Sequence, residues 1–178
     1  MRRMFRRQIR KSLAQEVPPI LQEANFAFSK GEYGRAAELF EQIARVADGR
    51  GGPRAPLFHL QAGRARVLAG QAVLGMPSLK RGLELLAQRR QFQRLHEFGT
   101  RTVSELNGQG LKNEAAEIEA WLMSVLPEMP AFAQPVKRPV LPVHCPSCGA
   151  PLRPDEVEWL DEVTAECGYC GSPVREDN

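Results

Sequence analysis

The chain has 178 residues, of which 43% are hydrophobic and 25% are charged, and its net charge is +3. This composition is typical of a globular protein with one sizeable core, and it excludes a chain that is disordered throughout. No stretch approaches the run of about twenty apolar residues that a membrane-spanning helix requires, and no apolar segment with a small-residue cleavage site follows the N-terminus, so we expect a cytoplasmic protein.

The N-terminal segment, residues 1–16, is strongly basic. Residues 1–11 carry six Lys and Arg side chains and no acid. Five apolar residues can share one side of a helix whose other sides are cationic, namely Met1, Met4, Phe5, Ile9 and Leu13. This pattern predicts a basic amphipathic segment, in which residues 1–13 either bind an anionic membrane surface or form a solubilising tail.

Residues 17–126 show helical periodicity. Apolar residues recur at intervals of three and four, beginning with Ile20, Leu21, Ala24 and Phe28 and ending with Ile118, Trp121, Leu122 and Val125. Clusters of glycine and proline interrupt the pattern, the clearest of them at Gly49–Pro56. We therefore predict a mostly α fold of about six helices arranged as antiparallel hairpins.

The first hairpin carries a specific motif. Gly31, Glu32 and Tyr33 are followed by a small, an aromatic and a small residue, at Ala36, Phe40 and Ala44. This order resembles the inter-helix turn and second helix of tetratricopeptide repeats, a family of stacked helical hairpins of about 34 residues. The resemblance covers about residues 18–126, closely in 20–47 and loosely in two later units, the second of which has a longer turn from Gly70 to Pro77.

The resemblance to tetratricopeptide repeats implies an α-solenoid with a concave face that binds a protein or peptide partner. We place four residues on that face: Phe26, Arg64, Arg94 and Arg101.

A proline-spaced linker follows the helices. Prolines recur at 127, 130, 135, 139 and 142, which excludes a helix, and the stretch lacks the alternation of a strand. Residues 127–142 are therefore predicted to form an extended linker between a helical domain, 17–126, and a C-terminal domain, 143–178. The C-terminal domain is acidic, with eight carboxylates against two arginines.

All the cysteines lie in the C-terminal domain, as two Cys-x-x-Cys pairs: Cys145 with Cys148, and Cys167 with Cys170. A glycine follows each pair and lets the backbone turn sharply around an ion. This spacing predicts one Zn²⁺ held by four thiolates. The ion should be structural, because four protein ligands leave no coordination position for a substrate. Two disulfides in an exported chain and a thiol redox switch are the alternatives. We expect the neighbouring His144 to be exposed and not to act as a ligand.

The segments Cys145–Gly149 and Cys167–Gly171 resemble the two knuckles of a zinc ribbon, in which the tips of β-hairpins clamp one tetrahedral zinc ion. The resemblance covers about residues 143–175. Between the knuckles, apolar residues alternate with acids around a turn at Leu160–Glu162, which predicts a hairpin; they are Val157, Trp159, Val163 and Ala165. So small a domain buries little apolar surface, and the metal should therefore supply most of its stability.

The remaining sequence favours binding over catalysis. The three histidines are scattered, and no phosphate-binding loop is recognisable. One basic stretch on the helices comprises Lys80, Arg81, Arg89, Arg90, Arg94, His96 and Arg101. We expect only Glu84 and Glu97 to oppose these cations. The stretch is either a solvated face, a binding site for an acidic peptide or for the acidic C-terminal domain, or a contact for nucleic acid. The acidity of the C-terminal domain argues against nucleic acid, because it repels phosphate.

We therefore expect a non-enzymatic adaptor for protein–protein interactions. A membrane-peripheral scaffold and a nucleic-acid-associated factor are the alternatives, and the oligomeric state stays open.

Overall fold

The computed structural model describes residues 17–126, 139–154, 157–160 and 163–175. Contacts between residues divide the chain into two compact units, Met1–Gln22 with Arg138–Asn178, called the C-terminal unit below, and Glu23–Lys137, called the helical unit. The predicted basic segment and most of the predicted linker lie outside the described residues. None of the described helices is both long enough and apolar enough to cross a bilayer.

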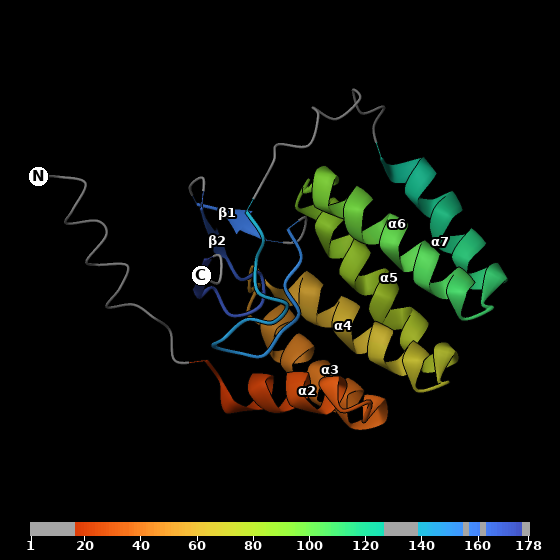
Figure 1. The fold of residues 1–178 in the computed structure, drawn as a ribbon. Coiled ribbons are helices and arrows are strands. Elements are labelled where there is room, and N and C mark those ends of the chain that lie inside the picture. The colour runs from red at the N-terminus through yellow and green to blue at the C-terminus, as the bar shows by residue number, and fades with distance from the viewer. Residues whose placement is uncertain (1–16, 127–138, 155–156, 161–162, 176–178) are drawn as a thin grey trace, which may run out of the picture. The chain divides into compact units, whose positions relative to one another are not determined.

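Six α-helices occupy the described residues up to 126, and consecutive helices run antiparallel (Figure 1). They are α2 at Pro19–Ser29, α3 at Tyr33–Gly49, α4 at Ala55–Leu68, α5 at Ala72–Gln88, α6 at Phe92–Gly108 and α7 at Lys112–Val125. From α3 to α7, each helix packs against the next one in the chain. The mostly helical fold and the predicted number of helices are therefore confirmed for this part of the chain.

Helices α2 to α6 end in one repeated type of turn. After α2, the Gly31 N–H donates to the Phe28 carbonyl oxygen at 3.1 Å, and the Glu32 N–H donates to the Ala27 carbonyl oxygen at 3.0 Å. The same pair of bonds ends α3, α4, α5 and α6. The residue at the centre of each turn has a φ between 55° and 78°, and it is glycine everywhere except at Arg90. This is the Schellman geometry, which glycine adopts without steric cost.

Helices α4 and α5 approach closely because glycines lie where they cross. A Cβ added at Gly63 would lie 2.8 Å from both the Gly75 carbonyl oxygen and the Leu79 backbone nitrogen. A Cβ at Gly75 would lie 2.7 Å from the Gly63 carbonyl oxygen, and one at Gly82 would lie 2.8 Å from the Pro56 carbonyl oxygen. Backbone atoms cannot rotate away as a side chain can, so this hairpin requires glycine at the crossing.

One predicted boundary was wrong. The segment from Gly70 to Pro77 predicts a longer turn, but α5 begins at Ala72 and contains Pro77. Proline has no amide hydrogen to donate to the carbonyl of Val73 and normally disfavours a helix interior. Val73 is 85% exposed, so water can reach this part of the helix. The helix persists because its apolar face is buried in the core, through Met76, Leu79, Leu83 and Leu86.

Asp48, near the end of α3, connects three helices. Its carboxylate accepts hydrogen bonds from Nε and Nη2 of Arg81 in α5, at 2.9 and 3.1 Å, and lies 3.3 Å from Nε2 of His59 in α4. The hydrogen bonds from Arg81 lower the pKa of Asp48. Burial lowers the pKa of His59, although Asp48 acts in the opposite direction. The imidazole is therefore neutral at neutral pH and donates to the carboxylate through Nε2–H.

Acid should destabilise the helical unit in two steps. Because the pKa of His59 in the folded chain is below its ordinary 6.5, the unfolded chain binds this proton first, and stability falls as the pH drops below about that value. The pKa of Asp48 is also lowered, from an ordinary 3.8, so more stability is lost as the pH falls below about that value. The free energy of unfolding can be measured by urea unfolding at several pH values, followed by helical circular dichroism. Near pH 6 it should change less with pH in a His59→Gln variant than in the wild type. Equal dependence in both proteins would contradict this expectation.

The C-terminal unit contains a three-stranded antiparallel sheet in the order β1–β2–β3. The strands are β1 at Glu158–Trp159, β2 at Thr164–Glu166 and β3 at Pro173–Arg175. Trp159 pairs with Ala165, which confirms the predicted hairpin. The third strand was not predicted, and it pairs with β2 through Ala165 and Val174.

The burial at the start of β2 and in the residue before it differs from the predicted alternation. Val163 is 53% exposed, whereas the neighbouring Thr164 is buried. Thr164 pairs across the strands with Arg175, and its hydroxyl oxygen accepts a hydrogen bond from Arg175 Nε at 3.2 Å. The unpredicted strand β3 thus provides the polar partner that allows a threonine to be buried here.

Candidate metal centre and pocket

The four cysteines lie on two loops with the same backbone geometry. In the first loop, the Gly149 N–H donates to the Cys145 carbonyl oxygen at 2.9 Å; in the second, the Gly171 N–H donates to the Cys167 carbonyl oxygen at 2.8 Å. Both glycines have a positive φ, 72° and 78°. The conformation explains why each Cys-x-x-Cys pair is followed by glycine, because a side chain there would be strained.

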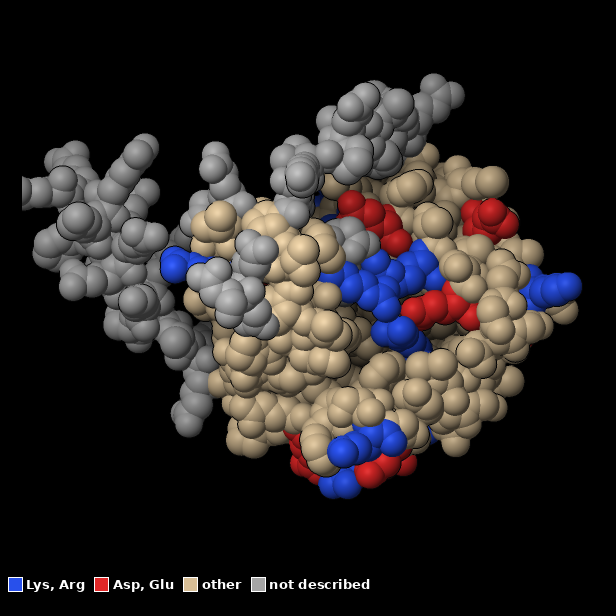
Figure 2. All heavy atoms as spheres, in the orientation of Figure 1, with Lys and Arg blue, Asp and Glu red and all other residues tan. Residues whose placement is uncertain are grey.

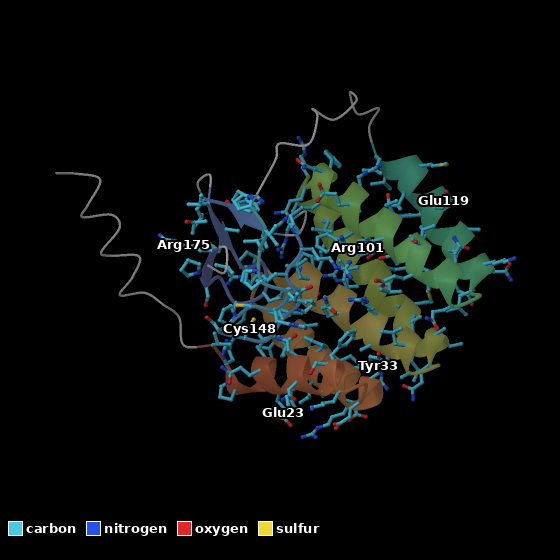
Figure 3. The ribbon with its side chains drawn as sticks, in the orientation of Figure 1. Glu23, Tyr33, Arg101, Glu119, Cys148 and Arg175 are labelled. Atoms are coloured by element: carbon cyan, nitrogen blue, oxygen red, sulfur yellow. The ribbon has the colours of Figure 1, made fainter. Side chains whose placement is uncertain are left out.

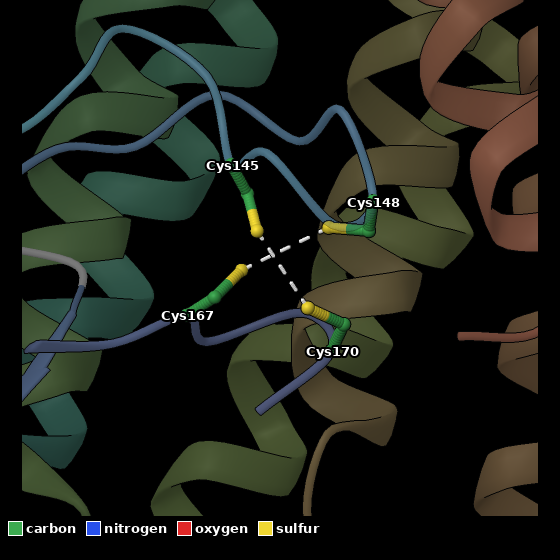
Figure 4. Close-up of side chains that lie close together, drawn as sticks. All are labelled: Cys145, Cys148, Cys167 and Cys170. Atoms are coloured by element: carbon green, nitrogen blue, oxygen red, sulfur yellow. Dashed lines mark hydrogen bonds between the residues drawn. The ribbon is translucent and has the colours of Figure 1, made fainter. Parts of the chain in front are cut away.

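The four thiols converge on one point (Figure 4). The Sγ atoms of Cys145 and Cys170 are 3.7 Å apart, those of Cys148 and Cys167 are 3.9 Å apart, and all four lie within 4.8 Å of one another. A disulfide needs a separation of about 2.05 Å, and none of these cysteines forms one. Four cysteines are therefore placed to hold one metal ion.

The thiols are buried and influence each other's titration. Each of the four cysteines is at most 8% exposed. A hydrogen bond with Cys148 lowers the pKa of Cys145 to about 6, and hydrogen bonding with Cys145 lowers the pKa of Cys170. Hydrogen bonds with Cys145 raise the pKa values of Cys148 and Cys167. His144 is exposed, as expected, and within the described residues it is not among the side chains placed to hold a metal ion.

The basic stretch at 80–101 is partly neutralised by acids that are distant in the sequence. Arg81 is paired with Asp48, and Lys80 is paired with Glu117 of α7. Arg89 Nη1 donates to the carbonyl oxygen of Pro53 at 3.0 Å. The expectation that only Glu84 and Glu97 oppose these cations was therefore wrong, because the partners are 33 and 37 residues away and reach the cations only through helix packing.

A pocket of about 210 Å³ opens between α4, α5 and α6 in the helical unit. Its apolar lining comes from Val67, Leu68, Leu79 and Leu106, and its polar lining includes Arg64, Thr102, Glu105 and Gln109. Arg64 Nη2 is 3.0 Å from Glu105 Oε1, and the guanidinium carbon lies 5.3 Å from the centre of the Phe28 ring. Figure 2 shows Lys and Arg side chains gathered beside acidic ones on the face in view.

One of the four residues that we predicted on a concave face lines this pocket. Arg64 lines the pocket, whereas Phe26, Arg94 and Arg101 do not. Phe26 is 61% exposed, with Lys30 Nζ at 5.4 Å from its ring centre. Arg101, labelled in Figure 3, precedes Glu105 on α6 by about one turn.

Sequence reasoning missed most of the pocket lining. Thr102, Glu105 and Gln109 stand at spacings of three and four along α6 and its end, which puts them on one helical face. That spacing was the available signal. The face was not recognised because its residues are mostly polar and show no apolar stripe.

No family model matches the chain, and no curated protein and no solved structure shows significant similarity to it. The assignment of function therefore rests on the geometry of the four thiols and of the pocket.

Proposed function

We propose that this chain is a non-enzymatic adaptor for protein–protein interactions, in which a helical array resembling tetratricopeptide repeats binds a peptide and a zinc ribbon offers a second contact surface. The pocket between α4, α5 and α6 is the observation that carries this proposal. It combines apolar walls with an Arg–Glu ion pair, and its lining contains no histidine or cysteine. Such a lining suits recognition of a side chain better than proton transfer or nucleophilic attack.

Zinc is the metal that best fits the four thiols. With Zn–S bonds of about 2.3 Å, the sulfur atoms of a tetrahedral site lie about 3.8 Å apart. The Sγ separations of Cys145 from Cys170 and of Cys148 from Cys167, 3.7 and 3.9 Å, agree with that value. Cys145, Cys148, Cys167 and Cys170 would hold the ion, and an ion saturated by four thiolates joins the two loops without offering a position to a substrate.

The packing of the first hairpin supports the likeness to tetratricopeptide repeats, whereas the length of the repeats differs from that of the family. Phe28 contacts Tyr33 and Phe40 edge to face, with ring centres 5.3 and 6.5 Å apart, which joins α2 to α3 around the motif that carries the resemblance. The turns within successive hairpins are centred on Gly31, Gly70 and Gly110, which are 39 and 40 residues apart. These repeats are therefore longer than the family's usual length of about 34 residues.

The alternative functions have less support. Neutralisation of Arg81 and Lys80 leaves the stretch at 80–101 with fewer charges for phosphate contacts, which weighs against a nucleic-acid-associated factor. Membrane attachment through residues 1–13 stays a prediction, because that segment lies outside the described residues. A cytoplasmic location and a second contact surface on the zinc ribbon are parts of the proposal.

Affinity capture from extracts of the native cells tests the adaptor function. The full zinc-loaded chain should retain specific proteins, and a Gln109→Trp variant, which obstructs the pocket, should lose those that bind the array. Met123→Trp is the matched control, because Met123 is 76% exposed and lies outside the pocket lining. Recovery of no protein above the level of a blank resin, or turnover of a small molecule by the purified chain, would contradict the adaptor function.

A further inference from the structure

The pocket has the size and lining of a receptor for one apolar side chain. An apolar cavity of about 150 Å³ holds a benzene ring, and this pocket is larger, at about 210 Å³. Val67 and Leu68 of α4 contribute to its walls together with Leu79 of α5. A leucine, methionine or phenylalanine side chain would therefore find room and an apolar environment in it.

Arg64 is held in place independently of its acidic partner. Its guanidinium lies over the Phe28 ring, so it stays positioned if the bond to Glu105 breaks. Arg64 Nε is buried and has no hydrogen-bond partner in the described part of the chain. Because the Arg64 side chain as a whole is 24% exposed, a ligand carboxylate would reach the guanidinium through its terminal N–H groups, on the side that Glu105 now occupies.

Glu105 is the more loosely held member of the pair. The side chain of Glu105 is 34% exposed and that of Arg64 is 24% exposed, and ion pairs with this degree of exposure contribute little stability. Replacing Glu105 at Arg64 with another carboxylate therefore costs little free energy.

We propose that the pocket binds a peptide in which an apolar side chain fills the cavity and an adjacent Asp or Glu takes the place of Glu105 on Arg64. This inference rests on the adaptor function proposed above and specifies the chemistry of the partner. Glu105 then acts as an internal substitute for the ligand, which keeps Arg64 paired while the pocket is empty. Binding exchanges one ion pair for another and adds the burial of the apolar side chain.

Selection of a random dodecapeptide library on the full zinc-loaded chain tests this proposal. We expect enriched sequences to share a leucine, methionine or phenylalanine next to an acid. The most enriched peptide, labelled with fluorescein, and its analogue with the acid changed to the amide would then be titrated against the protein variants.

The variants should shift affinity in opposite directions. Glu105→Gln should tighten binding of the acidic peptide, by up to about fivefold, because it removes the competing carboxylate. Arg64→Gln should weaken binding of the acidic peptide by a similar factor. For the amide analogue, neither substitution should shift the affinity in these opposite directions. Gln109→Trp should weaken both peptides about tenfold or more, whereas Met123→Trp should leave them unchanged. Circular dichroism confirms that each variant is folded.

The outcomes separate this inference from the adaptor function. Enriched peptides whose affinity is the same for wild type, Gln109→Trp and Glu105→Gln would overturn the assignment of the pocket while leaving an adaptor that binds elsewhere. Enriched peptides without an acid, or weaker binding by Glu105→Gln, would overturn the exchange at Arg64. Enrichment of no peptide would overturn the inference, and the capture experiment above would then decide the adaptor function by itself.

Discussion

Replacing Cys170 with serine is expected to abolish zinc binding and to unfold the C-terminal sheet and the two cysteine loops while leaving the helices folded. The three remaining thiols cannot complete a closed tetrahedral site. The sheet has only strands of two and three residues, so it cannot replace the lost metal with packing. Zinc binding contributes roughly 10–16 kcal/mol in small metal-folded peptides, which is more than such a unit can lose.

Elemental analysis and circular dichroism measure the two halves of this prediction. Wild-type protein should contain one zinc ion per chain, and the Cys170→Ser protein should contain none and keep its helical signal. Cys145→Ser should behave in the same way, and Ser147→Ala is a suitable control, because Ser147 is exposed in the first loop and its side chain is not a ligand. Loss of helix content in the cysteine variants would show that the helices depend on the metal, and metal-free wild-type protein would refute the zinc site.

The substitution Gly63→Ala is expected to lower the free energy of unfolding of the helical unit by about 3 kcal/mol, the upper end of ordinary overpacking. The new methyl group would lie 2.8 Å from two backbone atoms of α5 and 2.6 Å from Leu79 Cγ. Alanine favours a helix over glycine by about 1 kcal/mol, so the steric cost has to exceed that gain. Urea unfolding followed by helical circular dichroism gives the difference directly.

A second glycine separates packing from helix propensity. Gly34 of α3 has nothing within 4 Å of an added Cβ, so Gly34→Ala should be neutral or stabilise the protein by up to about 1 kcal/mol. Gly82→Ala should resemble Gly63→Ala, because its added methyl group would lie 2.8 Å from the Pro56 carbonyl oxygen. Equal effects at Gly34 and Gly63 would mean that α4 and α5 do not approach as closely as the structure shows.

The candidate metal centre could be predicted from the sequence more fully than the pocket. Each Cys-x-x-Cys pair and its glycine form a single turn, and a turn is decided by neighbouring residues. The pocket was less accessible, since Arg64 and Glu105 are 41 positions apart in the chain and their contact requires α4 and α6 to pack around α5. Of the predicted face residues only Arg64 lines it.

Local sequence alone determined the helices, most of their ends and the two cysteine loops, because hydrophobic spacing and glycine act within a few residues. Tertiary structure decided the continuation of α5 through Pro77, the pairing of Arg81 with Asp48, and the third strand beside β2. In each case burial or a hydrogen bond with a distant segment outweighed the local preference. Such partners become neighbours only when the chain packs, so the stability that they contribute cannot be read from the residues adjacent in sequence.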